Sequence, residues 1–143
     1  MFKRGKENEK DSIEWWCNHL AKRGWYNIQP TQGIDEYCHY DVKAEYSGHT
    51  CIFELKRRYV NSDTYSDAVL DWHKVRDNIN YKNANNIYRA FVVNMWMDKW
   101  SMNNIEKYTY ISEKIAGKTT EFGNKNKIVH TYCHYDIKGH NYD

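Results

Sequence analysis

Apolar residues recur along this chain at helical spacing in two stretches and at strand spacing in most of the remainder. The first helix is predicted to run from Asp11 to a stop at Gly24, with an apolar face made of Ile13, Trp16, Cys17, Leu20 and Ala21. The second is predicted after a capping loop at 61–63, with an apolar face made of Tyr65, Ala68, Val69, Trp72, Val75 and Ile79. Residues 1–10 are polar and are expected to fray.

Strand patterns lie between and after the helices. Residues 25–29 alternate weakly and stop at Pro30, the only proline, and 36–60 reads as a hairpin. The run Ala90-Phe91-Val92-Val93 predicts a buried strand within 87–96, with a turn at 97–99. The asparagine-rich segment 81–86 is predicted to be a connection. Further strands are expected within 100–112 and at 127–134.

The predicted element order is helix, strand, strand, strand, helix, strand. A helix that links two strands of one sheet implies a right-handed parallel crossover, here joined to an antiparallel hairpin. The predicted fold class is therefore α/β, a mixed sheet flanked by helices. With 143 residues the chain is predicted to be a single domain, with 11–96 as its core and 97–143 as a C-terminal extension.

The hairpin turn is predicted at Ser47-Gly48, because glycine reaches positive φ without steric cost. A two-residue turn there pairs Asp41 with Glu54, with Cβ atoms about 5 Å apart, and places Lys56 on the same face. A looser four-residue turn keeps all three on that face. The opposite face is expected to be the core, and it carries Cys38, Tyr40, Val42, Ala44, Tyr46, Cys51, Phe53 and Leu55.

Two carboxylates beside a lysine suit the hydrolysis of phosphodiesters. Asp41 and Glu54 are candidate ligands of Mg²⁺, with the main-chain carbonyl of Leu55 as a third, and Lys56 is placed to face the attacking water. The alternative is a solvated polar face with ion pairs, which contribute only about 0–1 kcal/mol each.

Tyr40-Asp41 on one strand and Glu54-Leu55-Lys56 on the next resemble the signature of the PD-(D/E)XK nucleases. The resemblance covers residues 11–96, with Tyr40 in place of the nominal proline. It implies the restriction-endonuclease-like αβββαβ core and magnesium-dependent cleavage of DNA, with Mn²⁺ able to substitute. Small members include restriction enzymes, Holliday junction resolvases and phage recombination nucleases. Because resolvases and many restriction enzymes act as dimers, a homodimer is also expected.

The resemblance adds candidates on both helices. The family often contributes an acidic residue from its first helix, here Glu14, although Asp11 and Glu14 also match the N-cap and N3 positions of a capping box. Asp35 and Glu36 are the weaker alternatives. On the second helix Lys74, and after it His73, are the candidates for a basic residue near the site, against the alternative of a solvated helix face.

Four basic residues close to the site are candidates for contacting DNA phosphates, and the alternative for each is an ordinary surface charge. They are Lys43, Arg57, Arg58 and, less directly, His39. Lys74 is a further candidate for this role. The formal net charge is only +2, so any affinity for DNA must come from local patches.

The four cysteines are widely spaced and form no C-x-x-C pair, so they are expected to be reduced thiols. No apolar run approaches the length of a membrane span, so no membrane partner is expected, and the location is expected to be the cytoplasm of a bacterial or phage-infected cell.

The segment from Tyr37 to Lys43 recurs almost intact from Tyr132 to Lys138. Two Cys-His pairs could in principle bind zinc, but adjacent residues on a strand point to opposite faces, which disfavours one shared ion. Three functions follow: a Mg²⁺-dependent endonuclease acting on DNA, with junctions, flaps, ends and specific duplexes all open as substrates; a non-catalytic nucleic-acid-binding or assembly protein on the same fold; or a zinc-stabilised interaction module.

Overall fold

The computed structural model describes residues 6–31, 38–65, 67–108, 110–119 and 125–136. Its first half contains α1 (Lys6–Lys22), β1 (Tyr26–Pro30), β2 (Val42–Tyr46) and β3 (His49–Arg57). Its second half contains β4 (Asp67–Asp71), α2 (Trp72–Ala84), β5 (Arg89–Met95), β6 (Trp100–Asn104), the 3-10 helix η1 (Ile105–Lys107), β7 (Tyr110–Thr119) and β8 (Lys125–Asp136).

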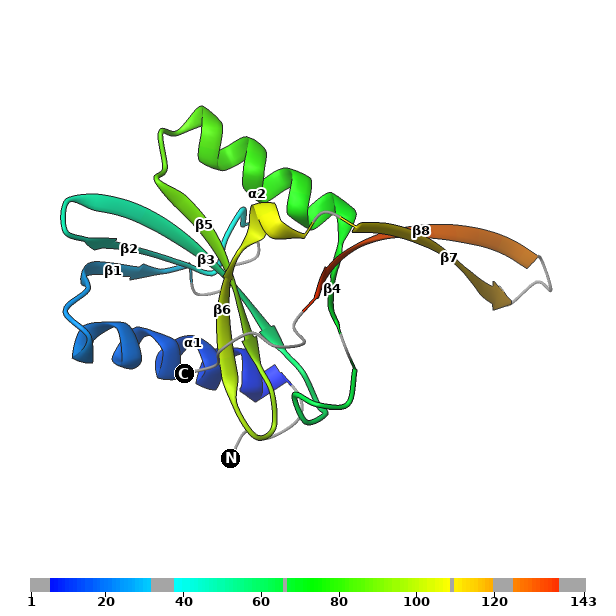
Figure 1. The fold of residues 1–143 in the computed structure, drawn as a ribbon, viewed down its shortest axis with the longest axis horizontal. Helices are drawn as coiled ribbons and strands as arrows, with labels where there is room; N and C mark the ends of the chain where they lie inside the picture. Colours follow the sequence, from blue (N-terminus) through cyan, green and yellow to red (C-terminus); the bar gives the residue numbers. More distant parts are fainter. Residues whose placement is uncertain (1–5, 32–37, 66, 109, 120–124, 137–143) are drawn as a thin grey trace.

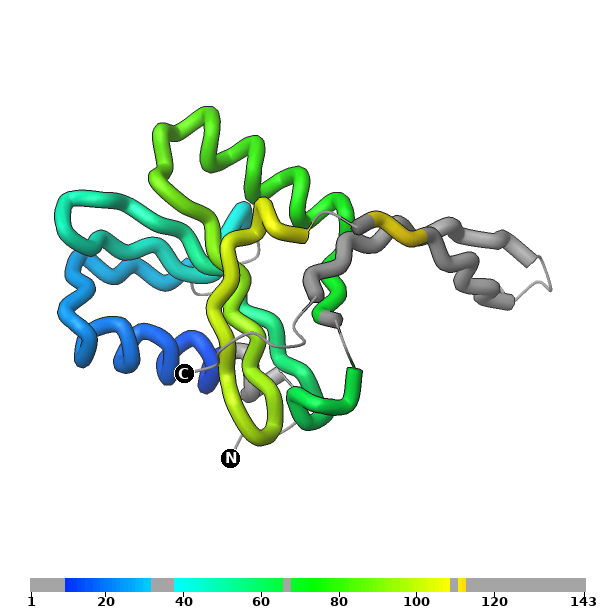
Figure 2. The backbone as a smooth tube through the Cα atoms, viewed as in Figure 1, coloured from blue at the N-terminus to red at the C-terminus, as the bar shows by residue number. Residues whose placement is uncertain are grey.

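The larger sheet has five strands in the order β1-β2-β3-β5-β6 (Figure 1). The β3–β5 pair is parallel, and the other neighbouring pairs of this sheet are antiparallel. After α2 the chain enters β5 beside β3 and then turns back as β6, a path that can be followed in Figure 2. The predicted mixed sheet, with a helix linking two parallel strands, is confirmed. A smaller antiparallel sheet has the order β4-β8-β7.

Helices α1 and α2 lie on opposite sides of the large sheet (Figure 1), and each covers its own core. Under α1, Trp16 and Leu20 pack with buried residues of the sheet, among them Val42, Ala44, Phe53 and Val93. Under α2, Val75 packs with Ile52, Ala90 and Val92 from the other face of the sheet and with Leu70 from β4. Strand β3 is therefore buried on both faces, whereas the sequence pattern had predicted only the face with Phe53 as core.

The β2–β3 hairpin has the predicted register, since Tyr46 pairs with His49 and Val42 with Phe53. Both turn residues have positive φ, 51° at Ser47 and 81° at Gly48. That is the backbone of a type I′ turn, whose twist matches the flanking strands.

The predicted start of the first helix is wrong. Helix α1 begins at Lys6, so residues 6–10 are helical and not frayed. Asp11 therefore lies inside the helix, and the capping box of Asp11 and Glu14 does not exist. The acidic and basic residues of 6–10 are good helix formers, and they extend the helix beyond its first apolar residue.

The predicted start of the second helix is also wrong. Residues 67–71 form β4, which pairs with β8, and α2 begins at Trp72. Asp71 caps it by accepting a hydrogen bond from the main-chain N–H of His73 (2.8 Å). The helix then continues through Ala84, across most of the segment predicted as a connection. Ala68 and Leu70 alternate as in a strand, but the partner that stabilises this strand lies more than fifty residues further along the chain.

Replacing Gly48 with alanine is expected to lower the free energy of unfolding by about 1 kcal/mol, because a Cβ is disfavoured at positive φ. No heavy atom lies within 4 Å of the added Cβ, so backbone conformation alone causes the loss. Ser47→Asn is expected to have the opposite sign, since asparagine tolerates positive φ better than serine. Urea denaturation measures both, and equal stability of the two variants would contradict the assignment.

Candidate active site

Asp41 lies one residue before β2, close enough to Glu54 of β3 for its charge to act on that carboxyl group. Its main-chain N–H donates to the carbonyl of Phe53 (2.9 Å), the residue that pairs with Val42, so the regular ladder of the hairpin ends at Val42. Its Oδ2 accepts a hydrogen bond from the main-chain N–H of Leu55 (2.8 Å). These two bonds hold the Asp41 carboxylate against β3, next to the side chain of Glu54.

Glu54 is buried, with only 8% of its surface exposed, on the face of the sheet that α2 covers. Ile52 precedes it on the same face and is fully buried. The solvated polar face that was the alternative for these residues is therefore not what the structure has at Glu54.

Burial, and after it the nearby charge of Asp41, raises the pKa of Glu54 to about 8, even though Lys74 and Lys56 act in the opposite direction. The Oε2 atom of Glu54 is buried and accepts no hydrogen bond from the described residues. A carboxylate in this position is expensive to ionise unless a cation joins it.

Lys74 brings a positive charge from α2 to this carboxylate. Its Nζ lies 3.6 Å from Glu54 Oε2, an ion pair slightly too long to be a hydrogen bond. The same Nζ donates to the main-chain carbonyl of Cys38 (3.2 Å), in the segment that leads to Asp41. The structure thus brings the first-choice basic residue of the second helix to the site, whereas His73 is exposed beside Trp72.

Lys56 and Lys43 lie on the same face of the sheet as Glu54. Lys56 follows two residues after Glu54 on β3 and is exposed, and Lys43 pairs with Ile52 across the hairpin and is half-buried. Because side chains alternate along a strand, both lysines point to the face of the sheet that carries Glu54. The buried end of the site is therefore acidic, and its solvent side carries lysines.

Arg57 and Arg58 are used in packing. Arg58 donates from Nε to Asn94 Oδ1 (3.0 Å) and from Nη2 to the carbonyl of Val69, and burial lowers the pKa of its guanidinium. Arg57 donates to the carbonyl of Met95 (3.2 Å). These bonds tie the end of β3 to β5 and β4, so both arginines contribute to the packing of the sheet.

Glu14 is exposed on α1, the helix that covers the opposite face of the sheet. Within the described parts of the chain, no three histidine, cysteine, aspartate or glutamate side chains gather as a metal cluster, so Glu14 does not complete a three-carboxylate site with Asp41 and Glu54. Its alternatives, Asp35 and Glu36, lie outside the described residues.

The sequence reasoning missed a cluster at the rim of the site. His39 Nδ1 lies 2.9 Å from Asp77 Oδ1, and its ring stacks on Tyr81 with centroids 4.8 Å apart. Tyr40 also contacts Tyr81, and burial together with that hydroxyl raises the pKa of Tyr40. Asp77 and Tyr81 follow Lys74 at helical spacing, which is the signal that could have placed them on one face of α2.

The repeated segment is folded differently in its two copies. Cys38 and His39 of the first copy lie in irregular chain before β2, whereas Cys133 and His134 of the second pair with Leu70 and Val69 inside the small sheet. The side chains of the second copy lie outside the described residues. Cys17, Cys38 and Cys51 form no disulfide within the described residues.

A divalent cation fits the chemistry of Asp41 and Glu54. Glu54 has a buried Oε2 without a hydrogen-bond partner among the described residues, a raised pKa and the Asp41 carboxylate beside it. A dication bound there would lower the free energy of the ionised form of Glu54. The two side chains, with the carbonyl of Leu55, are the groups that could hold it.

No protein-family model matches the chain, and no curated protein is similar to it in sequence. Among solved structures it is similar to the 1.6 Å structure of Archaeoglobus fulgidus Hjc, a Holliday junction resolvase from an archaeal hyperthermophile. The TM-score is 0.59 at 15% identity, over 90% of this chain and 88% of that chain. The chain shares its fold with a Holliday junction resolvase. The predicted fold class, a mixed sheet flanked by helices, is confirmed by the strand order and by this match.

Neither α1 nor α2, the helices of the described chain, has the length and apolar character needed to span a bilayer.

Glu54→Gln is expected to stabilise the metal-free protein at high pH. In the unfolded chain Glu54 loses its proton near pH 4.5, whereas in the folded state it keeps the proton up to about pH 8. The stability of the wild type therefore falls as pH rises through that window. At about 1.4 kcal/mol per pKa unit, this loss of wild-type stability is at most about 5 kcal/mol. Glutamine mimics the protonated side chain and escapes this loss.

Urea denaturation in EDTA at about pH 4 and about pH 8.5 measures the effect, because these values lie on either side of the window. The variant should exceed wild type in stability at the higher pH and match it at the lower. Glu45→Gln, on the same hairpin but hydrogen-bonded to Asn27 at the edge of the sheet, is the matched control. An equal difference from wild type at both pH values would contradict a buried Glu54 with a raised pKa.

Proposed function

We propose that this protein is a metal-dependent endonuclease that hydrolyses phosphodiester bonds in DNA, with Mg²⁺ as its ion and branched DNA as its substrate. One observation carries the proposal: Asp41 is held beside Glu54 at the β2–β3 hairpin, and Glu54 is buried with a raised pKa. Burying the Glu54 carboxyl group beside a second carboxylate destabilises the fold, so stability does not account for the pair.

Asp41 and Glu54 would hold the ion, with the carbonyl of Leu55 as a third ligand. When bound, Mg²⁺ supplies a water of lowered pKa and neutralises charge on the phosphate. Lys56, exposed two residues beyond Glu54, would orient the attacking water and stabilise the charge that develops on the phosphate. Lys74, 3.6 Å from Glu54 Oε2, favours the ionised carboxylate that a metal ligand requires.

Branched DNA is proposed because the neighbour with this fold is a Holliday junction resolvase. Lys43, Lys56 and Lys74 give the α2 face a local positive patch that could contact phosphates, although the net charge of the chain is only +2. A homodimer would supply two such sites for two symmetric cuts in a four-way junction.

The test is cleavage of a four-way junction, a flap and a linear duplex in Mg²⁺, in Mn²⁺ and in EDTA. We expect the junction to be cut fastest, in either metal and not in EDTA, because the metal recognises phosphate while the protein surface selects shape. Junction binding without cleavage of any substrate would favour the alternative of a non-catalytic nucleic-acid-binding protein on this fold.

Asp41→Asn, Glu54→Gln and Lys56→Ala are each expected to lower the cleavage rate by about 100-fold or more, since each removes a charge from the reacting centre. Glu45→Gln and Lys107→Ala are the charge-matched controls, and both residues lie away from the carboxylate pair. Single-turnover rates on the junction measure the effect. Cleavage that persists in all three site variants would exclude this site.

A further inference from the structure

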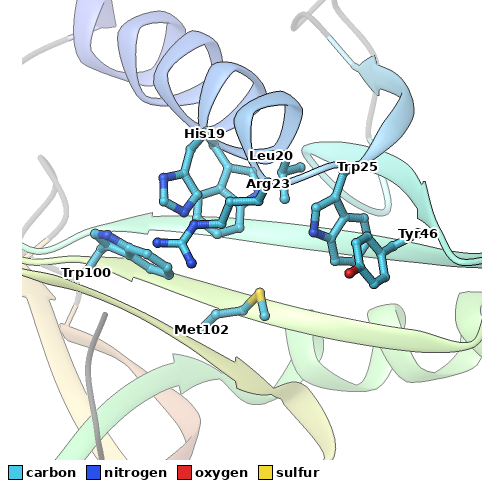
Figure 3. A pocket seen from close by; sticks show the side chains of 8 residues that line it. His19, Leu20, Arg23, Trp25, Tyr46, Trp100 and Met102 are labelled. Carbon is cyan, nitrogen blue, oxygen red and sulfur yellow. The ribbon is translucent and has the colours of Figure 1, made fainter.

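A groove of about 470 Å³ lies between the C-terminal part of α1 and the large sheet (Figure 3). The buried side chain of Trp16 lines it, and its remaining walls come from α1, from the segment after α1, from β2 and from β6. Residues of the sheet that line it, Tyr46 and Met102, alternate onto the face that α1 covers. The groove is therefore on the opposite face from Glu54, and it does not depend on the proposed cleavage.

Aromatic rings stand at both ends of the groove (Figure 3). At one end Trp25 and Tyr46 have ring centroids 5.2 Å apart, and 48% of Tyr46 is exposed. At the other end Trp100 contacts His19, with centroids 4.6 Å apart. Exposed indole and phenol faces are the surfaces on which nucleobases stack, whatever their sequence.

The charge of the groove complements an anion. The guanidinium carbon of Arg23 lies 5.7 Å from the centre of the Trp100 ring, and His19 is beside it. None of the described residues that line the groove is acidic. A ligand that carries both a flat ring and a negative charge can use both features, and a nucleotide is such a ligand.

We propose that this groove binds an unpaired nucleotide of single-stranded DNA, with its base stacked on the aromatic side chains and its phosphate paired with Arg23. The volume lies within the range of about 300–1,000 Å³ found for pockets that hold small organic groups. The groove is open to solvent at Tyr46, so a strand can enter and leave it.

The test is binding of an oligothymidylate of about ten nucleotides, compared with an abasic oligomer of the same length and charge, followed by tryptophan fluorescence in EDTA. We expect the oligothymidylate to quench the fluorescence and to bind about 10-fold more tightly, because only it has bases to stack. Tyr46→Ala should reduce this preference. Arg23→Ala should weaken both oligomers and lower the salt dependence by about one phosphate contact.

Tyr88→Ala and Lys22→Ala are the matched controls, an exposed tyrosine and an exposed cation that do not line the groove, and neither should change binding. Equal affinity for the two oligomers, or binding that survives both Tyr46→Ala and Arg23→Ala, would overturn the proposal. A second outcome would also overturn it: sedimentation shows a dimer, Tyr46→Ala dissociates that dimer, and the oligomers have no effect on it. The groove would then be a contact between two copies of the chain. Because binding is measured without metal, the groove can be shown to bind single-stranded DNA even if the protein does not cleave DNA.

Discussion

The carboxylate of Glu54 is held in the interior of the sheet beside a second carboxylate, with the nearest described cation, Lys74 Nζ, 3.6 Å away. Much of the surrounding structure compensates for that arrangement. The Leu55 N–H holds Asp41 in place, and Lys74 links α2 to both Glu54 and the segment before β2. A fold selected only for stability would place an apolar residue at position 54. The electrostatic cost of burying Glu54 is therefore the strongest indication of function in the molecule.

Burial of β3 on both faces also separates two surfaces of different chemistry. Carboxylates and lysines gather on the α2 side, while rings and Arg23 gather on the α1 side. Because residues alternate along a strand, one short segment of chain can supply both surfaces without mixing them. A protein of this size can in this way present a candidate catalytic site and a candidate strand-binding groove on opposite faces of one sheet.

A polar network supports the end of β3 that carries Lys56. Asn94 is fully buried on β5, pairs in register with Lys56, accepts from Arg58 Nε and donates to Tyr108 Oη (3.0 Å). Satisfied buried networks of this kind define one arrangement of the elements that meet in them. Arg58 is thus part of the scaffold behind the candidate site, although its position after the signature had made it a candidate for phosphate contact.

Local patterns in the sequence were sufficient for the β2–β3 hairpin and for its register from Tyr46 and His49 to Val42 and Phe53, because turn chemistry and alternation act over a few residues. They were also sufficient for the apolar faces of α1 and β5. They could not show that 67–71 is a strand, since its partner β8 is distant along the chain. Nor could they show that Glu54 and Arg58 are buried or that His39 meets Asp77, because those environments arise only when α2 packs against the sheet. The sequence alone brought Asp41 and Glu54 to one hairpin, and the tertiary structure decided how strongly the pKa of Glu54 is raised, because desolvation depends on what covers the side chain.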